Sequence, residues 1–193
     1  AFTAPELHHQ GLIKTERSLE QDDFGLGVLA FLMLMGGLHP FFGVQLGQGE
    51  APPLFSRIAS GDFPYSRKRR TMVAPPPIAL PFETLHPGLQ DLFYRCFEDG
   101  HHEPDQRPDS TEWREALLEA EQNLAVCETN PQHQYASHQT ACSWCIRTRQ
   151  LGGRDPFPSR DATLNGRHLR PIPVHRMLQP NRVPQWRLQE GKM

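Results

Sequence analysis

An uninterrupted apolar stretch at residues 24–35 constrains the fold of this chain more than any other feature. Every residue from Phe24 to Met35 is apolar or glycine, so a helix there has no polar side to face water. A helix that is apolar on all sides is buried in a protein core or in a membrane. These twelve residues are too few to cross a bilayer, which takes about 20. The stretch therefore predicts a buried central helix around which the other helices pack.

The residues on either side of this stretch are typical of helix ends. Asp22 and Asp23 stand in front of it, where a side-chain cap and a negative charge suit the positive end of the helix dipole. Gly36, Gly37 and Pro40 follow it and predict the end of the helix. The two acidic residues are therefore expected to cap the central helix.

Apolar spacing predicts three further helices. A short one is expected at residues 54–60, a second opens at Pro87, and a third begins at Asp109, with Glu112 completing a capping box. The side chains expected to face the core are Leu54, Phe55 and Ile58 in the first, Leu89, Leu92, Phe93, Cys96 and Phe97 in the second, and Trp113, Leu117, Ala120 and Leu124 in the third.

Charge divides the chain into two parts. Residues 1–146 contain 10 Lys and Arg against 19 Asp and Glu, whereas residues 147–193 contain 10 against 3. Residues 159–193 combine arginines and prolines with few apolar residues, which predicts a disordered basic tail. Weak binding of nucleic acid by this tail is one possible role, although the regular aromatic residues of single-strand binders are missing.

Five short motifs resemble, in their order and spacing, the C-terminal lobe of a eukaryotic-type protein kinase. They are Ala4-Pro5-Glu6, Asp22-x-Phe24-x-x-Gly27, His39-Pro40-Phe41, Ile58-x-x-Gly61-x-Phe63 and Arg107-Pro108. Each motif is weak alone, but the series is specific. The resemblance covers residues 1–125 and implies a mainly α fold, the helical lobe of a kinase-like protein.

The resemblance also implies roles for individual residues. In the family, the Glu of the first motif pairs with a distant Arg, and the matching positions here are Glu6 and Arg107. A buried carboxylate needs a partner, and the planar guanidinium offers two parallel donors. Asp22 matches the family residue that holds the backbone of the catalytic loop. Since that loop has no counterpart in this chain, Asp22 is expected to act as a helix cap.

The string Asp23-Phe24-Gly25 spells the motif whose Asp binds Mg²⁺ in kinases. In the family it precedes the Ala-Pro-Glu motif, whereas here it follows and leads directly into the apolar helix. We therefore expect no Mg²⁺ role for Asp23. No glycine-rich phosphate loop is present either, so ATP and Mg²⁺ are expected to bind only in an intact, longer chain.

Cysteine and histidine residues after the third helix predict a structural zinc site. Cys142 and Cys145 form a CxxC turn, which holds two thiolates on one side of a metal, and Cys127 and His133 complete a tetrahedron. His138 is the alternative fourth ligand. A redox CxxC is disfavoured because no thioredoxin-like strand precedes it.

This region, with the following segment at residues 151–158, is similar to the zinc-knuckle-like extension behind the kinase domain of a group of bacterial kinase-like proteins. The expected organisation is therefore a partial kinase lobe at residues 1–125, a Cys/His zinc module at residues 126–158 and a tail at residues 159–193. The chain opens in the middle of a motif at Ala1, and we expect it to be an N-terminally truncated fragment.

The family reaction is transfer of the ATP γ-phosphoryl group to Ser or Thr hydroxyls of a protein, and the resemblance implies a cytoplasmic enzyme with a protein substrate or signalling partner. None of the family's catalytic or ATP-binding motifs occurs in residues 1–193, so this chain alone is not expected to catalyse. Two alternatives are a pseudokinase that serves as a signalling scaffold and a zinc-dependent nucleic-acid-binding protein. No stretch of the sequence predicts a membrane span.

Overall fold

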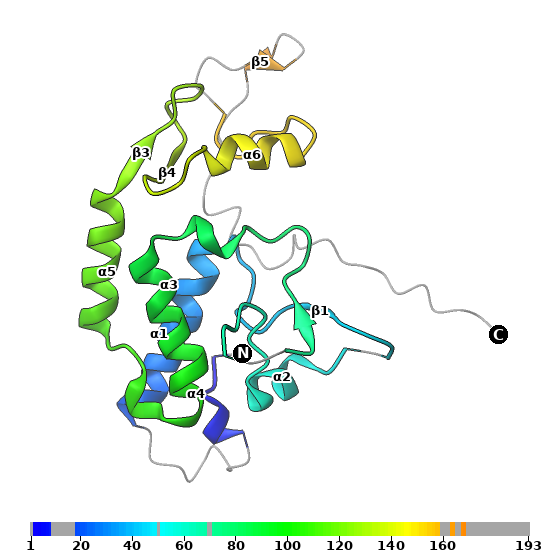
Figure 1. Cartoon of the computed structure of the whole chain (residues 1–193), viewed down its shortest axis with the longest axis vertical. Helices are drawn as coiled ribbons and strands as arrows, with labels where there is room; N and C mark the ends of the chain where they lie inside the picture. Colours follow the sequence, from blue (N-terminus) through cyan, green and yellow to red (C-terminus); the bar gives the residue numbers. More distant parts are fainter. Residues whose placement is uncertain are drawn as a thin grey trace, which may run out of the picture.

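The computed structural model describes residues 2–8, 18–49, 51–68, 71–158, 163–164 and 167–168 (Figure 1). It is mostly helical with three small sheets, which confirms the prediction of a mainly α fold. The helical elements are η1 (Pro5–Leu7), α1 (Leu19–Leu34), α2 (Leu54–Ser60), η2 (Phe82–Thr84), α3 (Pro87–Tyr94), the π-helical turn η3 (Arg95–Asp99), α4 (Gly100–His102), η4 (Pro104–Gln106), α5 (Ser110–Gln122) and α6 (Ser143–Gln150).

Each sheet consists of two antiparallel strands. The pairs are β1 (Val44–Gln45) with β2 (Val73–Ala74), β3 (Leu124–Val126) with β4 (Gln134–Ala136), and β5 (Thr163–Leu164) with β6 (Arg167–His168). We call the described residues up to 122 the helical body and residues 124–158 the Cys/His module. Figure 1 shows the module beyond the end of α5, with α6 beside β4.

The core of the helical body is built on one side of α1. Phe24, Val28 and Phe31 are buried, and the ring of Phe31 meets the rings of Phe93 and Phe97 edge to face. Such aromatic pairs add to the stability gained from burial. The opposite side of α1 differs from the prediction, because Leu29 and Met33 are 47% and 67% exposed. The central helix is therefore buried on one side only.

The start of α1 also corrects the prediction. The helix begins at Leu19, and Ser18 is its N-cap residue, whose backbone N–H donates to Gln21 Oε1 at 3.3 Å. Asp22 is therefore an exposed residue inside the first turns of the helix rather than its cap. Asp23 lies in the same helix, where the backbone cannot adopt the loop in which kinases hold Mg²⁺.

Gly27 marks the closest approach between α1 and η3. A Cβ atom at Gly27 would collide with the sulfur of Cys96, so only glycine allows the two elements to pack at this distance. Cys96 is fully buried, as predicted, and burial raises the pKa of its thiol to about 12. This cysteine is therefore an inert part of the core.

Helices α2 and α3 begin at the predicted residues, Leu54 and Pro87. The side chains that α2 buries differ from the prediction. In α2, Ile58 is buried but Phe55 is exposed and stacks on the ring of His8. Arg57 is buried instead, since its side chain donates to the carbonyl oxygens of residues 52 and 43 at 2.7 and 3.0 Å. In α3 and η3, all five residues of the predicted stripe are buried.

The last helix of the body has the predicted cap but a shorter buried face. Asp109 accepts hydrogen bonds from the N–H groups of residues 111 and 112, and Glu112 accepts from Asp109 N–H, which confirms the capping box. Trp113 is buried, whereas Leu117 is exposed. The helix ends at Gln122, so Leu124 belongs to β3 and not to the helical stripe.

Two further predictions concern the whole chain. No helix among the described residues has the length and apolar character needed to cross a membrane. The disorder expected for residues 159–193 lies outside the described residues, except that residues 163–164 and 167–168 pair as β5 and β6.

Candidate metal centre

The β3–β4 hairpin brings the first two predicted ligands together. Cys127 directly follows β3 and His133 directly precedes β4, and Cys127 N–H donates to His133 C=O at 3.0 Å. Within the connecting turn, His133 N–H donates to the carbonyl of Asn130 at 2.9 Å. The antiparallel pairing thus closes a tight loop that holds a thiol and an imidazole on adjacent positions.

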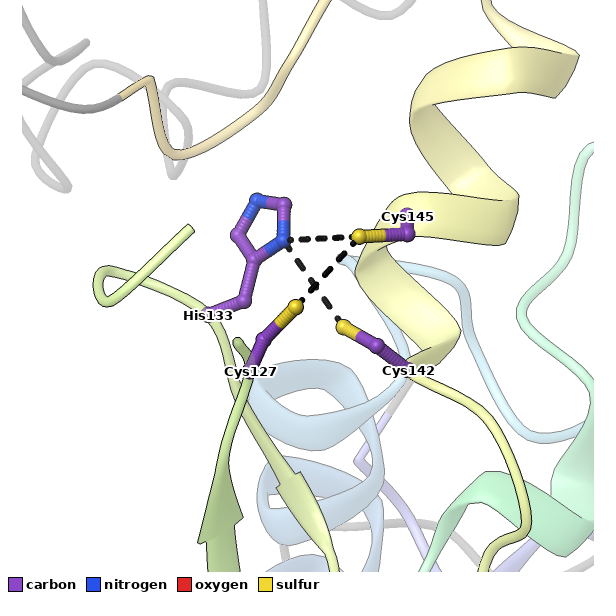
Figure 2. Close-up of side chains that lie close together, drawn as sticks. All are labelled: Cys127, His133, Cys142 and Cys145. Carbon is purple, nitrogen blue, oxygen red and sulfur yellow. Dashed lines mark hydrogen bonds between the residues drawn. The ribbon is translucent and has the colours of Figure 1, made fainter. Parts of the chain in front are cut away.

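The other two predicted ligands lie at the start of α6. Cys142 is the N-cap residue of this helix and Cys145 lies in its first turn. Residues three apart in a helix share one face, so both thiols point in the same direction. Figure 2 shows the four side chains converging from the hairpin and from α6.

Three of the separations among the four ligand atoms are close to those of a tetrahedral metal site, and all four atoms lie within 4.8 Å of one another. Cys127 Sγ and Cys145 Sγ are 3.5 Å apart, and His133 Nδ1 is 3.6 Å from Cys145 Sγ and 3.7 Å from Cys142 Sγ. Tetrahedral zinc implies separations of about 3.8 Å between two sulfurs and about 3.6 Å between sulfur and nitrogen. A disulfide requires about 2 Å, and all four cysteines of the chain are free.

The hairpin lowers the pKa of one of the thiols, that of Cys127, and so favours the thiolate form that binds a metal. Hydrogen bonds from the backbone N–H groups of Asn130 and Thr129, with contributions from the neighbouring thiols, lower the pKa of Cys127 to about 6 despite its burial. Burial and the adjacent thiols raise the pKa of Cys145 to about 12. Three crowded thiols cannot all ionise without a cation among them, and a bound divalent metal would supply that charge.

The two histidines proposed as ligands have different surroundings. His133 is buried and directs Nδ1 at the thiols. His138 is exposed, and its Nε2 lies 3.1 Å from the carbonyl oxygen of Glu83 in the helical body. Within the described residues, the Cys/His set placed to hold a metal contains His133 and not His138.

Trp144 lies between the CxxC cysteines and contacts both the hairpin and the segment after α6. Its Nε1–H donates to Gln134 C=O at 2.7 Å, and its ring meets that of Phe157 edge to face at 4.8 Å. The segment that contains Phe157 therefore folds back onto the start of α6.

Sequence reasoning missed two polar residues behind His133. Asp155 Oδ1 lies 2.8 Å from His133 Nε2, and Asn130 Nδ2 lies 3.0 Å from Asp155 Oδ2. Burial alone would raise the pKa of Asp155, but hydrogen bonds from His133, Phe157 N–H and Asn130 lower it. The only signal in the sequence was an acidic residue in the short segment after the CxxC helix.

The donor set decides which metals fit. Three thiols and one imidazole suit a borderline-soft ion in tetrahedral coordination, and zinc is the common case. Four protein ligands leave no position for a water or substrate. The geometry therefore fits a structural centre and not a catalytic one.

Two residues of the kinase-like motifs, Glu6 and Arg107, meet at a separate place in the helical body. Arg107 donates to both carboxylate oxygens of Glu6, from Nη1 at 2.8 Å and from Nη2 at 2.9 Å. It also donates to the carbonyl oxygens of Glu20 and Gly100. Ala4 and Pro5 are buried beside the pair, whereas Asp22 is exposed and Gly27 contacts Cys96 as described above.

Glu6 is held in its charged form by this arrangement. Burial would raise the pKa of Glu6, but the hydrogen bonds from Arg107 and the positive charge of Arg107 outweigh it and lower the pKa below its ordinary value. The pair joins η1 to the loop before α5.

Comparisons with known proteins relate the chain to kinases. No family model and no solved structure matches it. Over 151 residues, 77% of its length, the chain is 33% identical to protein kinase YegI of Escherichia coli O157:H7 and 32% identical to protein kinase YegI of Escherichia coli strain K12. The chain spans 23% of the length of these relatives. The chain is therefore similar to part of two proteins that are named as protein kinases.

Proposed function

We propose that this chain is the C-terminal-lobe portion of a bacterial Ser/Thr protein-kinase-like protein, followed by a structural zinc module. The observation that carries the proposal is the bidentate pair between Glu6 and Arg107, which are 101 residues apart in sequence. These residues stand at the two motif positions where the kinase family places such a pair. The similarity to protein kinase YegI supports the same assignment.

In the intact protein, the reaction would be transfer of the ATP γ-phosphoryl group to a protein hydroxyl in the cytoplasm. Such catalysis depends on phosphate-binding, Mg²⁺-binding and catalytic-loop residues, and residues 1–193 have none of their motifs. The helical body would therefore act as the scaffold under the catalytic residues and as a surface for a protein substrate or signalling partner.

The zinc module would be held by Cys127, His133, Cys142 and Cys145. A zinc ion in this set cross-links the hairpin to α6, and in a segment with few apolar side chains it would provide most of the folding free energy. The module also contacts the helical body directly, since His138 and Gln139 both reach the carbonyl oxygen of Glu83, at 3.1 and 2.8 Å.

The test of the kinase proposal compares two proteins in an assay with ATP, Mg²⁺ and a protein acceptor. Residues 1–193 alone should show no phosphoryl transfer, whereas a longer protein that contains this chain should transfer phosphate. Turnover by residues 1–193 would overturn the proposal. Partner binding without transfer by the longer protein would instead favour a pseudokinase scaffold.

Weak nucleic-acid binding is the second candidate function. In the Cys/His module, Arg149 and Arg154 are exposed. Neutralisation of phosphates by such side chains gives an affinity that falls steeply with salt. Fluorescence anisotropy with a single-stranded oligonucleotide, repeated at increasing salt, should show weak binding that decreases in an Arg149→Gln/Arg154→Gln variant. No change in that variant would exclude a role for these two residues.

A further inference from the structure

The segment after α6 returns to the metal centre through a glycine turn. Gly152 and Gly153 have φ angles of 64° and 85°, in the left-handed region that favours glycine. Their N–H groups donate to carbonyl oxygens in the last turn of α6, at 3.1 and 2.9 Å. This turn reverses the chain, so that Asp155 and Phe157 lie against the hairpin and the start of α6.

Asp155 is the centre of a hydrogen-bond network behind His133. Its Oδ1 accepts from Phe157 N–H at 2.8 Å and lies 2.8 Å from His133 Nε2, and its Oδ2 accepts from Asn130 Nδ2 at 3.0 Å. A carboxylate can only accept hydrogen bonds, so the hydrogen between Asp155 and His133 belongs to the imidazole.

The orientation of the Asn130 amide excludes the other tautomer. Asn130 Oδ1 accepts from Gln132 N–H at 3.0 Å, which places the amide nitrogen toward Asp155. The two hydrogens on that nitrogen go to Asp155 Oδ2 and to the carbonyl oxygen of Phe157, at 3.0 and 2.8 Å. None remains for His133 Nε2, although the two nitrogens are 3.2 Å apart. His133 Nε2 is therefore a donor, and in the neutral imidazole Nδ1 keeps its lone pair.

We infer that Asp155 is a positioning residue of the metal centre, which fixes the Nε2–H tautomer of His133 so that Nδ1 is presented to the metal. This inference rests on the proposed zinc centre. A carboxylate behind a metal-ligating histidine sets the ring orientation and increases the basicity of the ligand. The lone pair of Nδ1 points at the space between Cys142 Sγ and Cys145 Sγ, which lie 3.7 and 3.6 Å away.

The same contact couples the metal to the placement of residues 151–158. Asp155 comes from this segment, whereas the four ligands come from the hairpin and α6. The ring of Phe157 packs on Trp144, inside the CxxC motif. Metal binding should therefore hold the segment against the site, and loss of the segment should lower the affinity of the site for the metal.

A purely local role for Asp155 predicts a different outcome. Its Oδ1 also accepts from Phe157 N–H two residues later, as in an Asx turn. If the turn were the only role, removal of the carboxylate would loosen residues 155–157 but leave the affinity for zinc and the tautomer of His133 unchanged.

The experiment compares Asp155→Ala with Glu128→Ala in the full chain. Glu128 is an exposed carboxylate next to Cys127, so its removal changes the charge near the metal without touching His133. Zinc affinity is measured by competition with a chelator, and the His133 tautomer by ¹⁵N NMR of the ring. Asp155→Ala should bind zinc about 10–100-fold more weakly and lose the protected Nε2–H signal, while Glu128→Ala should keep both.

A third variant covers the case in which Asp155→Ala does not fold. Asp155→Asn retains an oxygen acceptor for His133 and should recover part of the affinity, although its amide nitrogen faces that of Asn130. Zinc affinity in both Asp155 variants equal to that of Glu128→Ala would overturn the positioning role and leave the zinc centre standing. No zinc in the unmodified protein would overturn the zinc centre itself, and this inference with it.

Discussion

Arg107 binds Glu6 through two parallel hydrogen bonds of 2.8 and 2.9 Å, with its own side chain fully removed from solvent and that of Glu6 30% exposed. Two further donors of the guanidinium reach backbone carbonyls of α1 and α4. A buried cation is stable only when it is paired and its donors are used. One arginine therefore fastens the start of the described chain to the helices that follow.

Replacement of Arg107 should strongly destabilise the fold because it leaves the Glu6 carboxylate without its partner. We expect Arg107→Ala to lower the free energy of unfolding by about 3–5 kcal/mol, measured by urea denaturation. The exposed Arg114→Ala is the control and should change it by less than about 0.5 kcal/mol. In a double-mutant cycle with Glu6→Gln, the loss of unfolding free energy in the double variant should be much smaller than the sum of the losses in the two single variants. Additive losses would contradict a direct interaction.

Acid should weaken the Glu6–Arg107 pair. The pKa of Glu6 in the folded protein lies below its ordinary 4.5, so its contribution to stability is present above that value and is lost as pH falls through the folded pKa. The free energy of unfolding should therefore fall less steeply below pH about 4.5 in Glu6→Gln than in the unmodified protein. The exposed Glu115→Gln should keep the original slope. Identical slopes in all three proteins would argue against the lowered pKa.

Gly27 should not tolerate a methyl group. A Cβ there collides with Cys96 Sγ, so Gly27→Ala should destabilise by about 1–3 kcal/mol. Gly25 in the same helix is the matched control, because a Cβ at Gly25 makes only an ordinary contact of 3.5 Å with Phe2 C=O. Gly25→Ala should be neutral or stabilising by about 0.5–1 kcal/mol. Thermal unfolding compares the two, and Cys96→Ala should restore stability to Gly27→Ala if the clash is the cause.

Removal of zinc should affect the Cys/His module alone. If the proposed zinc centre forms, the module would depend on metal cross-links, whereas the helical body has its own aromatic core around Phe31 and Phe93. We expect one equivalent of zinc in the purified protein, and after chelation we expect faster amide hydrogen exchange in residues 124–158 with α1 still protected. Loss of protection in α1 on chelation would show that the two regions fold as one unit.

Substitution of His133 or His138 by alanine can identify the fourth ligand. His133→Ala should lose the metal, since its Nδ1 lies against two thiols. His138→Ala should retain it, because His138 contacts Glu83 C=O in the helical body. Metal content by elemental analysis distinguishes the two variants, and retention in His133→Ala with loss in His138→Ala would reverse the assignment.

Local signals in the sequence were enough to predict four of the helices and the cluster of Cys and His residues that could hold a metal. Caps such as Asp109 with Glu112, and the apolar spacing from Leu89 to Phe97, act over one or two turns, so they are visible without the fold. The CxxC pair is local for the same reason. The motif positions also indicated that Glu6 and Arg107 would meet, although only the fold brings them together.

Tertiary structure decided which faces are covered and which polar residues support the site. An all-apolar helix does not reveal that Leu29 and Met33 are exposed, nor does the pattern of α2 reveal that Arg57 is buried and Phe55 exposed. Asp155 reaches His133 across 22 residues of sequence, through a turn whose direction depends on Gly152 and Gly153. Sequence alone determined where four of the helices and the candidate metal ligands occur, because these depend on near neighbours. Burial and hydrogen-bond partners depend on chain reversal and packing over long separations, so only the fold determined them.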